Sequence, residues 1–234
     1  RHLQPHQGHL RVNLNGPELS QRQLDQVGVA LDVKGFMPED EGLALLALAS
    51  QVCAEVGPGA TILEVGAWCG KSATYLGAGA EAHGGVVFSL DHHHGSEENQ
   101  AGWEHFDAEL IDPNDGRLNT LPLWQRTVAR AGLEGTVVGL VGDSTTIGSR
   151  WSTPLDLLFI DGGHGEDPAW ADWRCWSPHV PVGGYIAIHD VFENPADGGR
   201  PPFELFSAAL ASGTFSEVAA VGSLRVIRRT ADEA

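Results

Sequence analysis

The sequence predicts an α/β fold, in which a mostly parallel sheet of seven strands is covered by helices on both faces and ends in an antiparallel hairpin. Five short runs rich in Val, Ile and Leu alternate with segments of helical spacing, which is typical of parallel strands joined by crossover helices. These runs are continuously apolar, as expected for strands that are buried on both faces. Two further runs flank Gly222-Ser223, a turn signal that indicates a terminal hairpin.

The expected elements follow this alternation in chain order. The first helix begins at Pro38, which is followed by three acids that suit the positive end of a helix dipole, and it continues with closely spaced leucines. Together the patterns predict strands at 61–65, 86–90, 136–141, 155–160, 185–188, 216–221 and 224–227, and helices at 38–56, 71–83, 118–131, 168–176 and 202–211.

The chain has an ordinary globular composition, with 42% hydrophobic and 19% charged residues, and no internal repeat or low-complexity linker divides it. We expect a single domain at residues 36–234, preceded by an added arm at residues 1–35. The segment 96–116 is long, polar and acidic, so it is expected to form a mobile flap.

The charge balance restricts the partners. Fourteen Lys and Arg against 31 Asp and Glu give a net charge of −17, which repels phosphate backbones and anionic lipid headgroups. No apolar run approaches the roughly 18–20 residues that cross a bilayer. The three cysteines are scattered without a C-x-x-C spacing, which argues against a disulfide framework or a zinc ribbon. We therefore expect a soluble cytoplasmic protein that acts on neither nucleic acid nor membranes.

The first predicted strand leads into a glycine-containing loop and then a helix. The interval from Gly66 to the Gly70-Lys-Ser sequence is one residue too short for a phosphate-binding P-loop, and Trp68 breaks a dinucleotide-binding fingerprint. A nucleoside that carries an amino acid fits better. In that interpretation Glu64 meets an ammonium group, the two glycines allow a close backbone approach, and Ser72 offers a hydroxyl. The alternative is a structural turn without a ligand.

These residues carry a family resemblance. The pattern from Glu64 through Gly66 to Gly70 resembles the first motif of class I S-adenosylmethionine-dependent methyltransferases. The loop Gly66-Ala67-Trp68-Cys69-Gly70-Lys71-Ser72 is similar to the Gly-Ala-Tyr-Cys-Gly-x-Ser loop of catechol O-methyltransferase and related metal-dependent O-methyltransferases. Over residues 38–229 the resemblance implies a Rossmann-like fold with S-adenosylmethionine as cofactor. It implies cofactor contacts at Glu64, Gly66, Ala67, Gly70 and Ser72.

The ends of the later strands extend the expected cofactor site. Asp91 ends the second strand, where its two oxygens can accept both ribose hydroxyls, and the resemblance assigns it this role, with His92 beside it. Asp143 and Ser144 follow the third strand, where family members place a polar group near the adenine amine. An Asp that caps a turn would have the same sequence signature, so both interpretations of Asp143 stay open. Asp161, after the fourth strand, completes the cofactor set.

The resemblance also implies a metal site. The family holds a divalent ion with an acid after strand four and an acid-amide pair after strand five, and Asp161, His189 and Asp190 occupy these places. The imidazole shifts the preference from Mg²⁺ toward Mn²⁺, Fe²⁺ or Zn²⁺ without excluding Mg²⁺, and we expect Mg²⁺ or Mn²⁺. His164 stands where the family has its catalytic Lys and is the expected general base; without an ion, Asp161 would orient it. In the alternative interpretation, His189 packs beside the cofactor and Asp190 caps the next segment.

The expected activity is methyl transfer to a hydroxyl of a small polar acceptor. A sugar, oligosaccharide or other natural product is favoured, because the expected pocket is rich in polar side chains and residues 91–100 look like actinobacterial methyltransferases for polysaccharide or antibiotic sugars. A homodimer is also considered. Two alternatives belong to other classes: a metallohydrolase that uses His92, His93 and His94, and a nucleotide-binding module without chemistry. Consecutive histidines on an extended segment face opposite sides, which disfavours the metallohydrolase.

Overall fold

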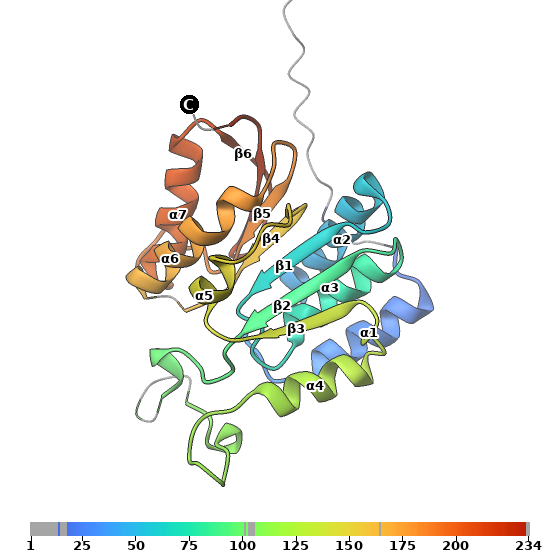
Figure 1. The fold of residues 1–234 in the computed structure, drawn as a ribbon, viewed down its shortest axis with the longest axis vertical. Helices are drawn as coiled ribbons and strands as arrows, with labels where there is room; N and C mark the ends of the chain where they lie inside the picture. The colour runs from blue at the N-terminus through green and yellow to red at the C-terminus, as the bar shows by residue number, and fades with distance from the viewer. Residues whose placement is uncertain (1–13, 15–17, 101, 103–105, 164, 233–234) are drawn as a thin grey trace, which may run out of the picture.

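A computed structural model describes residues 14, 18–100, 102, 106–163 and 165–232. Their strands form one sheet in the order β3-β2-β1-β4-β5-β7-β6 (Figure 1). The first five strands are parallel, and β7 is antiparallel to both β5 and β6. This arrangement confirms the predicted fold. The strands are β1 (Thr61–Val65), β2 (Val86–Asp91), β3 (Val137–Val141), β4 (Leu157–Ile160), β5 (Tyr185–Ile188), β6 (Phe215–Val221) and β7 (Leu224–Arg229).

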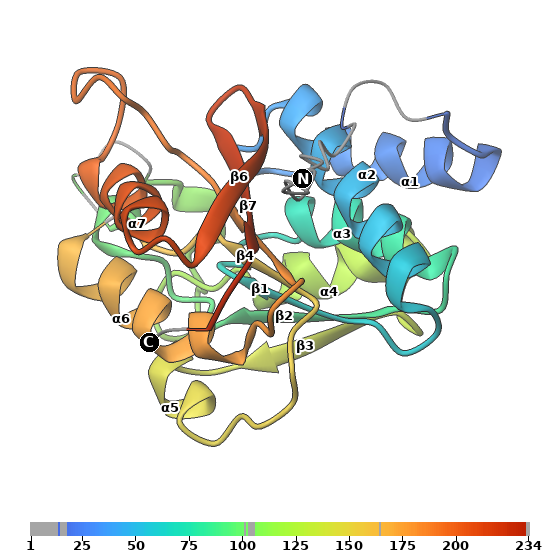
Figure 2. The same ribbon diagram turned by 90° about the horizontal axis from the view of Figure 1, so that it is seen from above.

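Helices cover both faces of the sheet (Figure 2). On one face lie α1 (Gln21–Asp32), α2 (Glu39–Val56), α3 (Lys71–Glu81) and α4 (Leu121–Arg130); on the other lie α5 (Ser144–Gly148), α6 (Glu166–Trp176) and α7 (Arg200–Ala211). Successive strand residues alternate between the two hydrophobic cores: Phe159 of β4 packs in the first and Leu158 in the second. Burial on both faces explains why the strand runs are continuously apolar. Among the described residues, no helix is both long and apolar enough to span a membrane.

Helix α1 lies within the stretch that was expected to form an arm, where no helix was predicted. Its start carries a capping box, in which Ser20 and Gln23 bond each other's backbone N–H groups. Arg22 contacts Glu81 of α3 through two hydrogen bonds of 2.8 Å, and Val27 is buried against the core. The helix is thus docked on the face that α3 covers.

The described part of the segment 96–116 contains two short 3-10 helices, η1 (Glu97–Asn99) and η2 (Ala108–Leu110). Lys34 lies 2.6 Å from Asp107 Oδ2 and 2.5 Å from Glu109 Oε2, and Leu110 packs in a small cluster with Cys69. These contacts anchor one part of the segment beside the loop after β1. Its mobility stays a prediction.

Candidate active site

A cleft of 1090 Å³ opens where the carboxyl ends of β1 to β5 meet. Ligand crevices of open α/β sheets lie at this edge. The lining includes most of the residues that the sequence singled out: Gly66, Ala67, Ser72, Asp91, His92, Asp143, Ser144, Asp161, His189 and Asp190. Glu64 and Gly70 do not line it. The predicted general base, His164, lies outside the described residues.

The two loop glycines are required for different reasons. Gly66 has a φ of +97°, and a Cβ there would lie 2.1 Å from the carbonyl oxygen of Asp161. The loops after β1 and β4 can therefore approach only at a glycine. Gly70 begins α3 with a φ of +90°, and a Cβ there would lie 3.2 Å from Trp124 of α4. Gly70 faces the packed helix rather than the cleft, so its cofactor contact stays a prediction.

Glu64 lies beneath the loop, fully buried. The hydroxyl groups of Ser72 and Ser89 both donate hydrogen bonds to its carboxylate, and Trp124 Nε1 donates to Ser89 Oγ at 3.0 Å. Burial raises the pKa of Glu64 to about 8, against the opposing effect of the two serine hydroxyls. Through Ser72, which does line the cleft, Glu64 supports the loop. Its direct contact with a cofactor stays a prediction.

Asp91 ties two loops together at the cleft wall. Its Oδ2 accepts a hydrogen bond of 2.8 Å from the backbone N–H of Trp68, and its Oδ1 accepts one of 2.7 Å from that of His93. Both donors have positive φ values, +46° and +63°, which are costly for residues with a side chain. Each carboxylate oxygen has a second lone pair for a ligand hydroxyl. Asp91 thus both holds the strained loops and remains able to bind a ribose.

Asp143 caps α5, as one of the two sequence interpretations predicted. Its Oδ1 accepts hydrogen bonds from the backbone N–H of Thr146 at 2.7 Å and from the hydroxyl of Thr145 at 2.8 Å. Hydrogen bonds from these threonines lower the pKa of Asp143. The Ser144 hydroxyl accepts a bond of 2.8 Å from Trp176 Nε1. Both residues also line the cleft, so the cap does not remove them from the expected adenine side.

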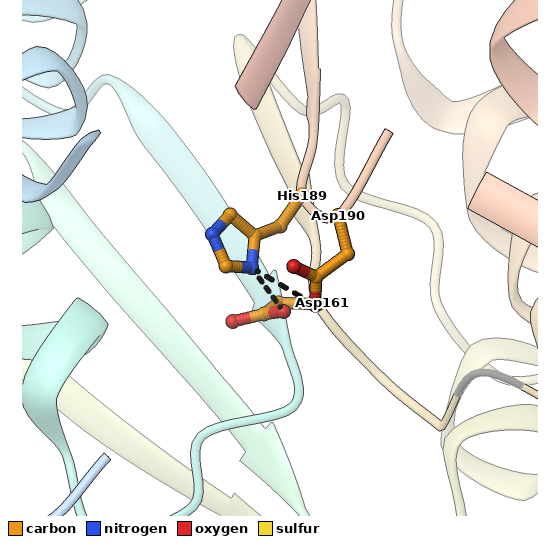
Figure 3. Close-up of side chains that lie close together, drawn as sticks. All are labelled: Asp161, His189 and Asp190. Atoms are coloured by element: carbon orange, nitrogen blue, oxygen red, sulfur yellow. Dashed lines mark hydrogen bonds and ion pairs between the residues drawn. The ribbon is translucent and has the colours of Figure 1, made fainter. Parts of the chain in front are cut away.

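Asp161, His189 and Asp190 converge where β4 and β5 end (Figure 3). One ligand atom from each lies within 4.8 Å of the others. The ring Nδ1 of His189 lies 3.0 Å from Asp161 Oδ1 and 3.4 Å from Asp190 Oδ2. Ligands about 2.1 Å from one ion are about 3.0–3.4 Å apart at octahedral to tetrahedral angles. The spacing therefore fits a divalent ion held by two carboxylates and one imidazole, and the binding of an ion by these residues stays a prediction.

The electrostatics of the cluster depend on Glu41 as well. His189 is buried, which by itself lowers its pKa, but the charge of Asp161 and hydrogen bonds to Asp161, Asp190 and Glu41 outweigh burial and raise the pKa to about 12. Burial opposes ionisation of Glu41, yet hydrogen bonds from His189 and Ser223 lower its pKa. Both ring nitrogens of His189 thus face carboxylates, Nδ1 those of Asp161 and Asp190 and Nε2 that of Glu41.

Sequence patterns did not point to two residues at the site, Glu41 and Asp172. Glu41 belongs to a run of three acids that suits any helix start, and no local signal tells which of them points inward. Asp172 of α6 is a buried acid that lines the cleft, and burial raises its pKa. It lies three residues after buried Ala169 and four before buried Trp176, and this helical spacing was a usable signal.

The three consecutive histidines do not gather around one point. His93 Nδ1 lies 2.7 Å from the hydroxyl oxygen of Thr120, and His94 Nδ1 lies 2.8 Å from the carbonyl oxygen of Leu118. His92 Nδ1 accepts a hydrogen bond from the backbone of His94. Within the described part of the chain, the convergent group of metal-ligating side chains is that of Asp161, His189 and Asp190. The geometry thus offers no support for a hydrolase site at the histidines.

Comparisons with known proteins agree with this geometry. A family model described as a methyltransferase domain matches residues 63–191, more than half of the chain.

Solved structures share the fold at low identity. The S-adenosylhomocysteine (SAH)-bound methyltransferase PaMTH1 of Podospora anserina is 12% identical, with 93% of this chain and 91% of that chain covered and a TM-score of 0.63. An O-methyltransferase from Bacillus cereus in complex with SAH is 16% identical, with coverage of 90% and 92% and a TM-score of 0.59. The O-methyltransferase TomG of Streptomyces achromogenes, involved in tomaymycin synthesis and in complex with SAM, is 15% identical, with 92% of each chain covered and a TM-score of 0.58.

Proposed function

Since the chain belongs to the methyltransferase-domain family, we propose that it transfers a methyl group from S-adenosylmethionine to a hydroxyl oxygen of a small polar acceptor. Its sheet order and terminal hairpin are those of class I S-adenosylmethionine-dependent methyltransferases. The observation that carries the proposal is that one cleft is lined both by the loop after β1 and by the Asp161, His189 and Asp190 cluster. A cofactor end and a reacting end thus share one cavity.

At the cofactor end, this proposal assigns Asp91 to the ribose hydroxyls and Asp143 and Ser144 to the adenine side. The lining supports it, because Asp91, Asp143 and Ser144 line the same cleft as the loop after β1. When bound, S-adenosylmethionine supplies a methyl group on a positively charged sulfur. The surrounding acids favour a cation, since the chain carries a net charge of −17.

At the reacting end, the protein has to align an acceptor hydroxyl and receive its proton. The transfer breaks the carbon–sulfur bond, forms a carbon–oxygen bond and releases the hydroxyl proton, which we assign to His164. When bound at Asp161, His189 and Asp190, a divalent ion such as Mg²⁺ or Mn²⁺ lowers the pKa of a nearby hydroxyl. These side chains would hold the ion and keep the acceptor in place.

The acceptor we propose is a sugar or another natural product. The residues that line the cleft include polar ones such as Glu97, Asn99 and Asp197 and the aromatic residues Trp68 and Phe192. Polar groups bind hydroxyls and an aromatic ring offers a face for the apolar side of a sugar ring. The involvement of the fold-related Streptomyces enzyme in tomaymycin synthesis supports a natural-product acceptor.

The proposal includes a cytoplasmic location, which is supported by the three cysteines, all of them free. The strong negative charge supports a small molecule rather than nucleic acid as the partner. A homodimer stays a prediction.

The test is methyl transfer from isotope-labelled S-adenosylmethionine to a panel of methyl glycosides and other polyols, read by mass spectrometry with and without Mn²⁺. We expect a singly methylated product, and we expect His164→Ala to lose turnover while it keeps SAH binding. His179→Ala is the matched control, since the backbone of His179 bonds Leu155 at the opposite edge of the sheet. SAH binding without transfer to any hydroxyl would refute the proposed reaction. Unchanged turnover in His164→Ala would remove that residue from its role.

A further inference from the structure

A buried carboxylate from a distant part of the chain contacts the candidate metal cluster. Glu41, in the first turn of α2, and His189, at the end of β5, have side chains that are each only 3% exposed. Glu41 Oε2 lies 2.5 Å from His189 Nε2, the ring nitrogen on the side away from Asp161 and Asp190. The imidazole thus lies between Glu41 and the two aspartates.

We propose that Glu41 is a positioning residue for the metal cluster. Glu41 accepts a hydrogen bond from His189 Nε2 and so leaves Nδ1 as the nitrogen that faces the ion. The inference rests on the metal assistance in the proposed function. Glu41 lies in α2, away from the strand ends that carry the other residues of the cluster.

The chemistry of imidazole supports this role. A neutral ring carries one N–H, and a strong acceptor at one nitrogen fixes the proton there and leaves the other nitrogen as the ligand. Carboxylates that accept from a ligating histidine also fix its orientation and raise its basicity, and their loss typically weakens metal binding about 10–100-fold. His189 Nδ1 already lies 3.0 Å and 3.4 Å from the oxygens of Asp161 and Asp190. When an ion takes the place of a proton at Nδ1, Glu41 keeps the ring proton on Nε2, so that Nδ1 is the nitrogen that binds the ion.

The surrounding backbone is shaped to hold Glu41 in place. The backbone N–H of Ser223, in the β6–β7 turn, donates a hydrogen bond to Glu41 Oε1. Gly222 beside it has a φ of +52°, and a Cβ there would lie 2.2 Å from the same oxygen. The carbonyl of Ser223 in turn accepts a bond of 3.0 Å from Val191 N–H, just after the cluster. Both carboxylate oxygens of Glu41 are thus engaged, one by the turn of the terminal hairpin and the other by His189.

The chain offers a matched control. Glu39 lies two residues before Glu41 in the same helical turn, and its side chain is exposed. Glu39→Gln and Glu41→Gln make the same chemical change, one in solvent and one against His189. In Glu41→Gln the single amide oxygen cannot accept from both His189 and Ser223. If that oxygen faces Ser223, the amide N–H₂ faces Nε2 and drives the ring proton to Nδ1, where it blocks the ion.

The first measurement is the affinity of the protein for Mn²⁺ alone, which is read from the electron paramagnetic resonance signal of the free ion. Binding that persists in Asp161→Asn is subtracted as non-specific. We expect Glu41→Gln to weaken site binding at least about tenfold. Glu39→Gln should match the wild type. If Glu41→Gln does not fold, Glu41→Asp carries the same expectation, because it keeps the charge but draws the carboxylate away from His189. Equal Mn²⁺ affinity in the folded variants and the wild type would overturn the inference, and so would a wild type that binds no Mn²⁺.

A second measurement separates positioning from a merely structural role. In the Zn²⁺-loaded protein, long-range ¹H–¹⁵N spectra report which ring nitrogen of His189 carries the proton, with the signal assigned from a His189→Gln variant. We expect Nε2–H in the wild type and loss of that tautomer in Glu41→Gln. An unchanged tautomer would refute the role of Glu41. Neither readout needs methyl transfer, so Mn²⁺ binding that depends on Glu41 in a protein without SAH affinity would uphold this inference while refuting the proposed function.

Discussion

The burial of Glu64 predicts how the stability of the fold depends on pH. Burial raises the pKa of this carboxyl from 4.5 to about 8, although the hydroxyls of Ser72 and Ser89 act in the opposite direction. Between these values the folded protein keeps a proton on Glu64 that the unfolded chain has lost. The free energy of unfolding therefore falls as the pH rises through this window. The stability that the protonated Glu64 gives to the folded protein is fully present below pH 4.5 and is lost above about pH 8.

Glu64→Gln is expected to remove this pH dependence. The difference between 4.5 and about 8 corresponds to about 4–5 kcal/mol, since one pKa unit is worth about 1.4 kcal/mol. Glutamine has nearly the same shape as protonated glutamate. The variant should therefore match the wild type at about pH 5 and exceed its free energy of unfolding at about pH 8.5 by an amount on the order of 4 kcal/mol.

The assay is urea unfolding followed by tryptophan fluorescence at a series of pH values, with the difference between variant and wild type taken at each pH. This difference cancels the other groups that titrate in the same range. Glu134→Gln, an exposed change in the turn before β3, is the control and should follow the wild type. A Glu64→Gln curve parallel to the wild-type curve from pH 5 to 8.5 would show that the carboxyl is not protonated in the folded protein.

Two further predictions concern the cleft wall. Gly66→Ala should lose SAH binding and about 2 kcal/mol or more of stability, because its Cβ would clash with the Asp161 carbonyl. The control is Gly59→Ala, which has a similar φ of +92° but no atom within 4 Å of the added Cβ. This control should keep SAH binding. Wild-type SAH affinity in Gly66→Ala, measured by calorimetry, would contradict the close approach of the two loops. Asp143→Ala should cost about 0.5–1 kcal/mol as a lost helix cap, measured by urea unfolding, and Asp143→Asn should restore most of it. An equal loss in both variants would mean that the cap is not the source.

The fold could be predicted largely because its strands are buried on both faces. In the sequence such strands are short, continuous apolar runs. Their alternation with helical segments predicted the parallel sheet, and the last two runs predicted its terminal hairpin. Helix α1 was missed even though its capping residues, Ser20 and Gln23, are present, because its polar sequence gives only a narrow apolar face. Helix α5 has only five residues, too few for a periodic pattern.

The candidate site divides in the same way. The convergence of Asp161 with His189 and Asp190 was predictable, because β4 and β5 are neighbours and the carboxyl ends of parallel strands share one edge. The sequence could not predict which side-chain oxygens are already used by hydrogen bonds within the protein. Glu64 is an example, since the hydroxyls of Ser72 and Ser89 bond its two oxygens beneath the loop. Glu41 reaches the cluster from 148 residues away, and only the folded hairpin turn brings its partners together. Sequence patterns locate strand ends, but contacts that pass between layers depend on packing.

Calorimetric titration of the wild-type protein with SAH tests the central claim most directly, with Asp91→Asn as the matched variant. Asp91 is the acid assigned to the ribose, and its two carboxylate oxygens accept hydrogen bonds from two backbone N–H groups. The asparagine in the variant has a single side-chain oxygen to replace these two. The account predicts micromolar binding of one SAH per chain and at least a tenfold weaker affinity in Asp91→Asn. A folded wild-type protein that binds no SAH would contradict the assignment of this cleft to the methyl donor.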